Sequence, residues 1–260
     1  MTATAVRTMT DQRSVPAELR SCLESEQRAV TAEIEALDAF VGRVEGVPAR
    51  NHAPVGGIHG TDHGSGRSGL KRVRQAYEET VMSVPHYDTD YGDTYRESVV
   101  AEFGPEVGTG LTEGHQFQPH LKQATIGKAR SCRADRERFL DILEIESQST
   151  TTVGDELRSI QEELQEFDSG SPSALGYGAL EAEWRRLDVL SGKIDRVATT
   201  LQQSIIRQRR EFTIPSSAPD VPTYLYHEFD DAYPLLSLCV ASQKRIQQYK
   251  SQREQGLAGV

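Results

Sequence analysis

One Gly-rich segment of the chain gathers most of the side chains that could bind a metal ion. Residues 51–69 read NHAPVGGIHGTDHGSGRSG, and their candidate ligands are His52, His59, Asp62 and His63. A zinc site needs such imidazole and carboxylate groups at a regular spacing on rigid elements. The spacing here is irregular, and the composition is typical of a segment that cannot bury enough apolar surface to order itself. We therefore interpret residues 47–69 as a flexible linker that binds no structural metal.

Other patterns with catalytic chemistry are missing from the sequence. It contains no phosphate-binding glycine loop, no GxSxG elbow and no HExxH motif. Di-iron helical bundles use Glu-x-x-His, whereas the acidic–histidine pairs here are Glu113 with His115 and His227 with Glu228. The three cysteines, Cys22, Cys132 and Cys239, are far apart and form no CxxC motif, which is typical of small buried residues in a reducing compartment. We expect no enzyme activity, no cofactor and no metal.

The charge pattern argues against general nucleic-acid binding. The formal net charge is −10, whereas phosphate contacts need a positive surface. Residues 133–138 and 207–210 are basic runs with interleaved or neighbouring acids, typical of ion pairs on helix faces. The run KRVR at 71–74 is the most concentrated positive patch free of acids and could contact an anion.

The composition also indicates the environment of the protein. Only 6 of the 29 basic residues are lysine, and the other 23 are arginine. An acidic surface with few lysines stays hydrated in concentrated salt, so one hypothesis is a protein of a high-salt cytoplasm that needs salt to fold. A GC-rich genome, which also favours arginine over lysine, is the alternative explanation. No apolar run is long enough to cross a membrane.

The chain is organised around the aromatic stretch 72–107. The spacing of its apolar residues predicts two short helices, 70–82 and 91–103, separated by a turn at Pro85 and capped by Asp88, Thr89 or Asp90. Their aromatic residues predicted to lie in the core are Tyr77, Tyr95 and Phe103. The tyrosine hydroxyls need partners when buried, and the candidates are Glu78, His86, Asp88 and Asp90. A docking role stays open for the turn residues His86, Tyr87 and Tyr91.

Long amphipathic segments surround this stretch and predict an all-α fold. Residues 119–167 and 175–212 carry apolar residues at three- and four-residue spacing, and Leu187 to Leu201 follows an a/d heptad. We expect these two helices to be antiparallel across a short turn, in an elongated helical bundle or hairpin with coiled-coil-like helices. We expect 119–167 to continue through the poor helix formers of 147–154, and 108–114 to be a loop.

The short helices 70–82 and 91–103 would wedge against this bundle. The expected organisation is a disordered N-terminus (1–16), an amphipathic helix (17–46), the linker (47–69), a main helical domain (70–212), a Pro-rich connection (213–231) and a C-terminal helix packed on the main domain (232–253).

A resemblance to a known family adds to this interpretation. The run AYEETVMSVPHYDTDYGDTYRESVVAEFGPEV, followed by LKQA and RERFLDILEIES, resembles a haloarchaeal family of helical proteins of unknown function, over residues 17–250. The resemblance implies a high-salt cytoplasm and supplies no activity and no catalytic residues.

Two functions from different classes follow as hypotheses. The first is a non-enzymatic interaction or scaffold protein, with a protein partner or with self-association through helix seams. The alternative is a nucleic-acid-associated regulator that uses residues 70–103 as a degenerate helix-turn-helix, although the acidic charge opposes it.

Overall fold

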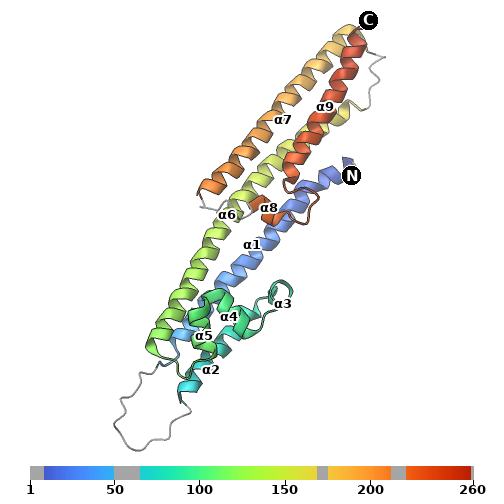
Figure 1. Ribbon diagram of the computed structural model, residues 1–260. Coiled ribbons are helices and arrows are strands. Elements are labelled where there is room, and N and C mark those ends of the chain that lie inside the picture. Colours follow the sequence, from blue (N-terminus) through green and yellow to red (C-terminus); the bar gives the residue numbers. More distant parts are fainter. Residues whose placement is uncertain (1–8, 50–64, 169–174, 212–220, 259–260) are drawn as a thin grey trace, which may run out of the picture. The chain divides into compact units, whose positions relative to one another are not determined.

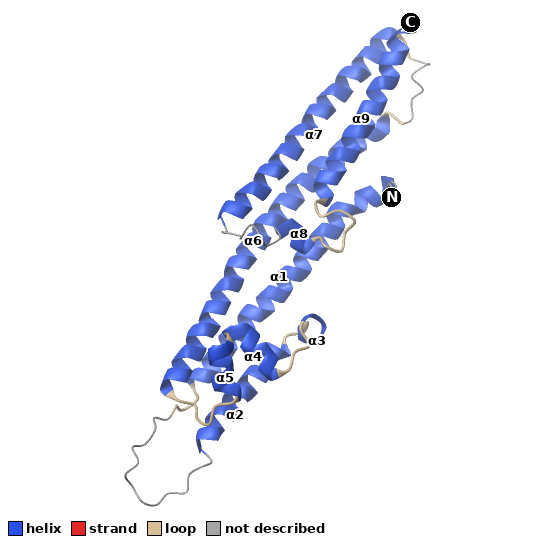
Figure 2. Cartoon of the chain, in the orientation of Figure 1, coloured by secondary structure: helices blue, strands red, loops and turns tan. Residues whose placement is uncertain are grey.

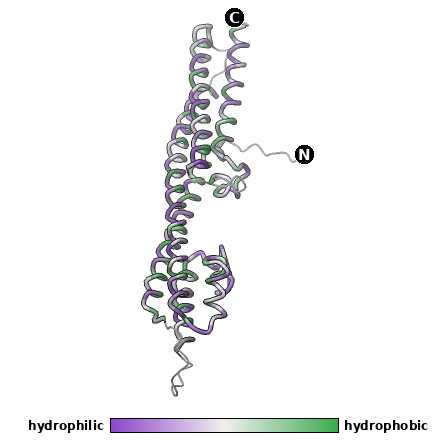
Figure 3. The backbone as a smooth tube through the Cα atoms, turned by 60° about the vertical axis from the view of Figure 1, so that its left-hand side comes forward, coloured by the Kyte–Doolittle hydropathy of each residue, from purple (hydrophilic) through white to green (hydrophobic). Residues whose placement is uncertain are grey.

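The fold is all-α, as predicted (Figures 1 and 2). The computed structural model describes residues 9–49, 65–168, 175–211 and 221–258, and no strand occurs within these ranges. The elements are α1 (Met9–Glu45), α2 (Ser65–Glu78), the 3-10 helix η1 (Val81–Ser83), α3 (Tyr87–Asp90), α4 (Tyr95–Phe103), α5 (Pro105–Thr112), α6 (Pro119–Glu166), α7 (Tyr177–Glu211), α8 (Val221–Leu225) and α9 (Pro234–Ala258). Hydrophobic and hydrophilic residues alternate along the helices, as the colours of Figure 3 show.

The chain divides into two compact units, where the sequence predicted a main domain over 70–212. Unit 1 comprises Met1–Glu24 with Ile142–Val260, and unit 2 comprises Ser25–Asp141. The boundaries differ because α1 and α6 are each long enough to contribute one part to the core of unit 1 and another part to the core of unit 2. A helical period marks the buried face of such a helix but does not mark where one core ends and the next begins.

In unit 2, α1 and α6 pack together in antiparallel orientation. Glu45 pairs with Arg130, Asp38 pairs with Arg133, and Glu33 pairs with Arg136, so positions advance along α1 as they recede along α6. The core between them includes these residues from α1, α2, α4, α5 and α6: Leu37, Phe40, Val44, Val73, Tyr77, Tyr95, Val99, Phe103, Val107, Leu111 and Ile126. The two predicted wedge helices therefore bury their apolar faces in this core.

In unit 1, α7 packs against α9 and is joined to α6 by ion pairs. Ion pairs of Glu163 with Lys193 and Arg186, and of Glu166 with Arg186, join α6 to α7 in antiparallel orientation. The apolar seam predicted for α7 is buried at Leu187, Leu190, Ile194, Val197 and Leu201. This seam therefore lies inside the chain's own fold.

Helix α6 is continuous through residues 147–154, as expected, and Gly154 has a packing role there. A Cβ atom on Gly154 would lie 2.9 Å from Cβ of Pro16 in α1, closer than real contacts allow. The missing side chain lets α1 approach at Pro16. The N-terminal prediction was wrong for residues 9–16, because α1 already begins at Met9 and includes Pro16 in its interior; residues 1–8 lie outside the described ranges.

Three other boundaries differ from the sequence prediction. Residues 65–69, expected in the linker, belong to α2, whereas 50–64 lie outside the described ranges. The predicted helix 91–103 begins only at Tyr95, as α4, because Gly92 has φ of +61° and Thr94 starts the helix with a capping box to Glu97. Residues 87–90, expected in the turn, form the separate short helix α3. In the Pro-rich connection, 221–225 form α8, and the last helix extends from Pro234 to Ala258.

Residues 105–112 form α5, where a loop was expected for 108–114. Helix α4 ends at residue 103, as predicted; Gly104, with φ of +85°, follows it, and Pro105 then starts α5. Gly108 permits a close approach of the two helices, because an added Cβ would lie 2.5 Å from Cγ2 and 2.9 Å from Cα of Val100.

None of the helices within the described ranges combines the length and the apolar character that a membrane crossing requires.

We predict that Gly108→Ala destabilises unit 2 by about 1–3 kcal/mol, because the new methyl group collides with the backbone of α4. Gly127→Ala in α6 is the matched control: nothing lies within 4 Å of its added Cβ, so the better helix propensity of alanine should raise stability by up to about 1 kcal/mol. Equilibrium unfolding in denaturant measures both changes. Equal effects of the two substitutions would contradict this account of the α4–α5 contact.

Candidate functional site

The three turn residues proposed from the sequence lie together, but they differ in exposure. His86 precedes α3, Tyr87 is its first residue, and Tyr91 follows its last. Tyr87 is buried, with 5% of its surface exposed, whereas Tyr91 is 50% exposed. The rings of Tyr87 and Tyr91 contact each other, with centroids 5.5 Å apart, and the ring of His86 lies 6.4 Å from that of Tyr91. Of the three, Tyr91 therefore presents the largest open surface.

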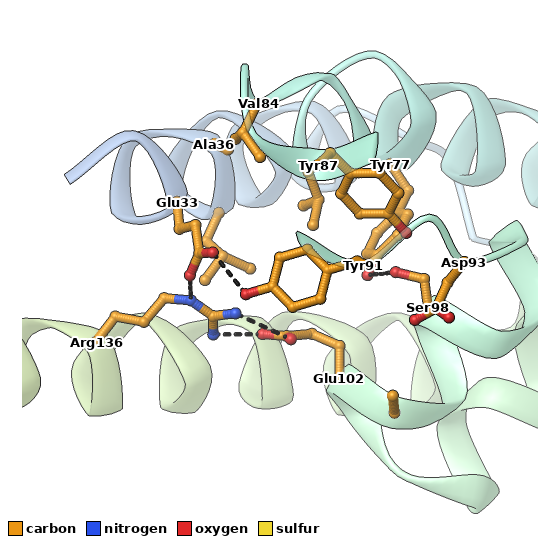
Figure 4. Close-up of a pocket in the computed structure, with 13 residues that line it drawn as sticks. Glu33, Ala36, Tyr77, Val84, Tyr87, Tyr91, Asp93, Ser98, Glu102 and Arg136 are labelled. Carbon is orange, nitrogen blue, oxygen red and sulfur yellow. Dashed lines mark hydrogen bonds and ion pairs between the residues drawn. The ribbon is translucent and has the colours of Figure 1, made fainter. Parts of the chain in front are cut away.

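Glu33 of α1 joins this turn to the rest of unit 2 (Figure 4). Its Oε1 accepts a hydrogen bond from the hydroxyl of Tyr91 at 2.8 Å and lies 3.0 Å from Nε2 of His86. Its other carboxylate oxygen, Oε2, accepts from Nε of Arg136 in α6. Both carboxylate oxygens are therefore occupied by groups of the protein itself.

Arg136 continues the cluster to α4. Its Nη1 and Nη2 donate to the two carboxylate oxygens of Glu102 at 2.6 and 3.1 Å, while Nε donates to Glu33. The side chain of Arg136 is only 21% exposed, so the guanidinium and its two carboxylates are largely removed from water. We call Glu33, Arg136 and Glu102 the arginine clasp.

The clasp shifts the pKa of Glu33 and of Arg136, each in the direction that keeps the group charged. Burial alone would raise the pKa of Glu33, but hydrogen bonds from His86, Arg136 and Tyr91 and the charge of Arg136 outweigh it and lower the pKa. For Arg136, burial alone would lower the pKa, but the hydrogen bonds and charges of Glu102 and Glu33 raise it. The ion pair between Glu33 and Arg136 is therefore kept at neutral pH, and Glu33 is not suited to exchange protons there.

A small cavity adjoins the clasp. Its volume is about 70 Å³, and its lining includes Tyr77, Tyr87 and Ser98 (Figure 4). The hydroxyl of Tyr77 is hydrogen-bonded to Oγ of Ser98 at 2.9 Å, whereas the buried hydroxyl of Tyr87 has no hydrogen-bond partner among the described residues. Ligand pockets usually measure several hundred Å³, so this cavity suits a few water molecules rather than a substrate.

The aromatic core beneath the cavity agrees with the sequence prediction. Tyr77, Tyr95 and Phe103 are all buried. The ring of Tyr77 makes edge contacts with the rings of Tyr95, Phe103 and Phe40, with centroids 5.3 to 5.7 Å apart. Burial raises the pKa of the Tyr77 and Tyr95 hydroxyls, so both stay neutral.

The hydroxyl partners differ from those expected. We proposed Glu78, His86, Asp88 and Asp90 as candidates, but Tyr77 bonds to Ser98 and Tyr91 to Glu33. The hydroxyl of Tyr95 is buried without a partner among the described residues. The difference arises because α4 begins at Tyr95, after the acidic turn residues Asp88 and Asp90, and turns Ser98 towards Tyr77.

The sequence reasoning missed the clasp, although the helical spacing contained a sign of it. Glu33 lies four residues before Leu37, and Arg136 lies four residues after Cys132, so both occupy positions of an apolar stripe. A charged residue at such a position is buried only when it is paired. Two opposite charges at apolar positions of neighbouring helices are therefore a pattern that could have indicated an ion pair.

The described residues offer little for metal or nucleophilic chemistry. They contain no group of three or more His, Cys, Asp or Glu side chains that could hold a metal ion, and the linker residues His52, His59, Asp62 and His63 lie outside them. Burial raises the pKa of the Cys132 and Cys239 thiols to about 11, which keeps both as unreactive thiols at neutral pH. The arrangement is suited to hold helices and a surface tyrosine in place.

We predict that Tyr77→Phe and Tyr95→Phe differ in stability although both rings are buried. Tyr77→Phe loses the hydrogen bond to Ser98 and should cost about 1 kcal/mol. Tyr95→Phe removes a hydroxyl that has no partner among the described residues, so it should be neutral or stabilising. Free energies of unfolding from denaturant titrations provide the comparison. A larger loss for Tyr95→Phe than for Tyr77→Phe would show that these hydroxyls have other partners.

We also predict that Arg136→Met destabilises the protein by about 3 kcal/mol, because it leaves two shielded carboxylates without their cation. Arg133→Met, one turn away on α6, is the control. Arg133 pairs with Asp38 and Glu137 at the surface, where such pairs contribute less than about 1 kcal/mol. The same unfolding measurement distinguishes them, and similar small losses for both would mean that the clasp does not stabilise unit 2.

Comparison with known proteins identifies the family. No curated protein and no solved structure matches the chain. A family profile described as "Domain of unknown function (DUF7260)" matches residues 15–250, which is most of the sequence and includes the clasp and the aromatic turn. The chain therefore belongs to the family described as a domain of unknown function, DUF7260.

Proposed function

We propose that the protein is a non-catalytic interaction protein and that the turn with Tyr91 is its docking surface for a protein partner. The observation that supports this proposal is the state of Tyr91: its ring is half exposed while its hydroxyl is bonded to Glu33. Tyrosines with a large contact area and few lost rotamers are frequent centres of binding energy in protein interfaces.

The rigidity of this tyrosine strengthens the argument. Glu33 is itself fixed by Arg136 and lies near Nε2 of His86, and the buried ring of Tyr87 supports the ring of Tyr91 from one side. A side chain already held in one position loses little conformational entropy when a partner covers it. The other conspicuous apolar surface of the sequence, the heptad seam of α7, is buried in unit 1 and offers no docking face.

The absence of catalysis belongs to the proposal and rests on the clasp. An acid–base catalyst needs a group whose pKa lies near the working pH and that can reach a substrate. Here the pKa of Glu33 is lowered, that of Arg136 is raised, and both are bonded to each other. The adjoining cavity of about 70 Å³ leaves no room for a substrate beside them.

The alternative of a nucleic-acid regulator is opposed by the fold of residues 70–103 and by the charge of the chain. Residues 70–103 contain α2 and α4, but η1 and α3 lie between them, and α4 buries Tyr95, Ser98, Val99 and Phe103 in the core. The net charge of −10 opposes binding to a phosphate backbone.

We further propose that the protein works in a high-salt cytoplasm, which the acidic charge and the scarcity of lysine support. Salt should then be required for folding, because it screens the repulsion among exposed carboxylates. Far-ultraviolet circular dichroism over a range of potassium chloride concentrations tests this expectation. Full cooperative folding without added salt would contradict it.

The docking role of Tyr91 can be tested by capture of partners from a lysate of the source organism. Tyr91→Ala should abolish the capture of specific partners, whereas Tyr91→Phe, which keeps the ring but loses the bond to Glu33, should weaken it only several-fold. Tyr177→Ala is the matched control, because Tyr177 is a comparably exposed tyrosine in α7 of unit 1.

Two further measurements make this test decisive. Denaturant unfolding should give Tyr91→Ala a stability close to that of the original protein, so that lost binding is not lost folding. Analytical ultracentrifugation of the same variants establishes whether the partner is a second copy of the chain. Partner capture that Tyr91→Ala leaves unchanged would refute the proposed surface.

A further inference from the structure

A second and larger hollow lies in unit 2, and its charged lining is entirely positive. It measures about 440 Å³ and is formed by α2, the start of α4 and the end of α5. The charged side chains that line it are Lys71, Arg74 and Arg96. Three converging cations are unexpected in a chain with a net charge of −10, because random placement on this surface would favour acids.

The cations keep donors that no described residue occupies. Lys71 is exposed and has no ion-pair or hydrogen-bond partner within the described part of the chain. Arg74 donates through Nε to Glu78 at 2.8 Å, and its guanidinium lies 5.0 Å from the centroid of the Tyr95 ring, so its two terminal nitrogens are not engaged by a described residue. Arg96 pairs with Glu113, with Nη2 2.6 Å from Oε1.

The backbone of α4 adds further donors to the same hollow. Tyr95 and Arg96 are the first two residues of α4, and both line the hollow. The first N–H groups of a helix have no partner within it. The capping box of Thr94 satisfies the N–H of Glu97, and no described residue accepts from the N–H groups of Tyr95 or Arg96. The positive end of the helix dipole therefore lies beside the three cations.

The remaining lining is suited to a small organic group. Leu70 and Leu111 contribute apolar surface, and the buried ring of Tyr95 separates the hollow from the core. A volume of about 440 Å³ lies within the range of pockets for small molecules and far exceeds that of a bare anion.

We propose that this hollow binds a small phosphate monoester, with its phosphate between Lys71, Arg74, Arg96 and the first N–H groups of α4, and its organic part against Leu70 and Leu111. Guanidinium groups match the oxygen geometry of phosphate, and helix N-termini stabilise its charge. This site lies on α2, α4 and α5 and is distinct from the Tyr91 surface, so the two proposals can fail separately.

Calorimetric titration of the full chain with phenyl phosphate tests the proposal, in potassium chloride at a concentration at which circular dichroism shows the protein to be folded. We expect saturable binding of phenyl phosphate, weaker binding of inorganic phosphate, and no measurable binding of phenol. Lack of phenyl phosphate binding in the millimolar range, or equal binding of phenol, would overturn it.

Charge variants assign the binding to this hollow. Lys71→Gln and Arg96→Gln should each weaken phenyl phosphate binding by about tenfold, the effect of one charge-assisted hydrogen bond. Arg72→Gln is the control, because Arg72 is exposed on the same helix but does not line the hollow. Equal weakening by Arg72→Gln would indicate a general charge effect and overturn the assigned site.

Two further comparisons complete the test. The first comparison is competition by a short single-stranded DNA. If the DNA displaces phenyl phosphate, and if its affinity falls as much in Arg72→Gln as in Lys71→Gln, the hollow binds nucleic acid and the proposal is refuted. Unfolding curves of all variants must coincide within error, and because Lys71 and Arg72 are both exposed on α2, their substitution should leave folding intact.

Discussion

The guanidinium of Arg136, bonded to Glu33 on one side and to Glu102 on the other, is the contact on which the arrangement of unit 2 depends. Removing three charged groups from water is unfavourable unless each one finds an opposite charge at hydrogen-bond distance. Any shift of α1 or α4 along α6 would leave a shielded carboxylate without its cation. Apolar side chains tolerate many relative positions of two helices, whereas this cluster tolerates one. The clasp therefore selects the register in which the apolar faces of α1, α4 and α6 meet.

The aromatic turn takes its position from the same cluster. Neither η1 nor α3 is long enough to be stable alone. Val84 and Tyr87 pack against Ala36 of α1, and the second attachment is the pair of contacts that Glu33 makes with His86 and Tyr91. A tyrosine ring on the surface is thereby fixed by a carboxylate that is itself fixed by the core. The position of the exposed Tyr91 ring, which we assign to a partner, therefore depends on the buried ion pair between Glu33 and Arg136.

The helices could be predicted from the sequence because their evidence is local. Apolar residues at three- and four-residue spacing gave the all-α class, the buried positions of Tyr77, Tyr95 and Phe103, and the continuity of α6. The clasp could not be predicted in the same way, because the choice of Arg136 for Glu33 depends on which helices meet, more than 100 positions apart in the chain. The start of α4 is an intermediate case. The sequence offers two cap patterns for this helix, the acids before Gly92 and the Thr94–Glu97 box. The positive φ of Gly92 interrupts the chain between them, so the helix starts after Thr94.

Salt acts differently on the two kinds of charge in this chain. The Debye length is about 8 Å at physiological ionic strength and becomes shorter in concentrated salt. Dissolved ions therefore weaken the attraction in exposed pairs such as Arg133 with Asp38. The clasp is largely shielded from solvent, and its members touch directly, so ions cannot intervene as effectively. An acidic surface and a charge-dependent core are therefore compatible: added salt relieves the repulsion outside while leaving the attraction inside nearly intact. In such a protein the specific electrostatic contacts have to be buried, and the position of the arginine clasp between three helices satisfies that requirement.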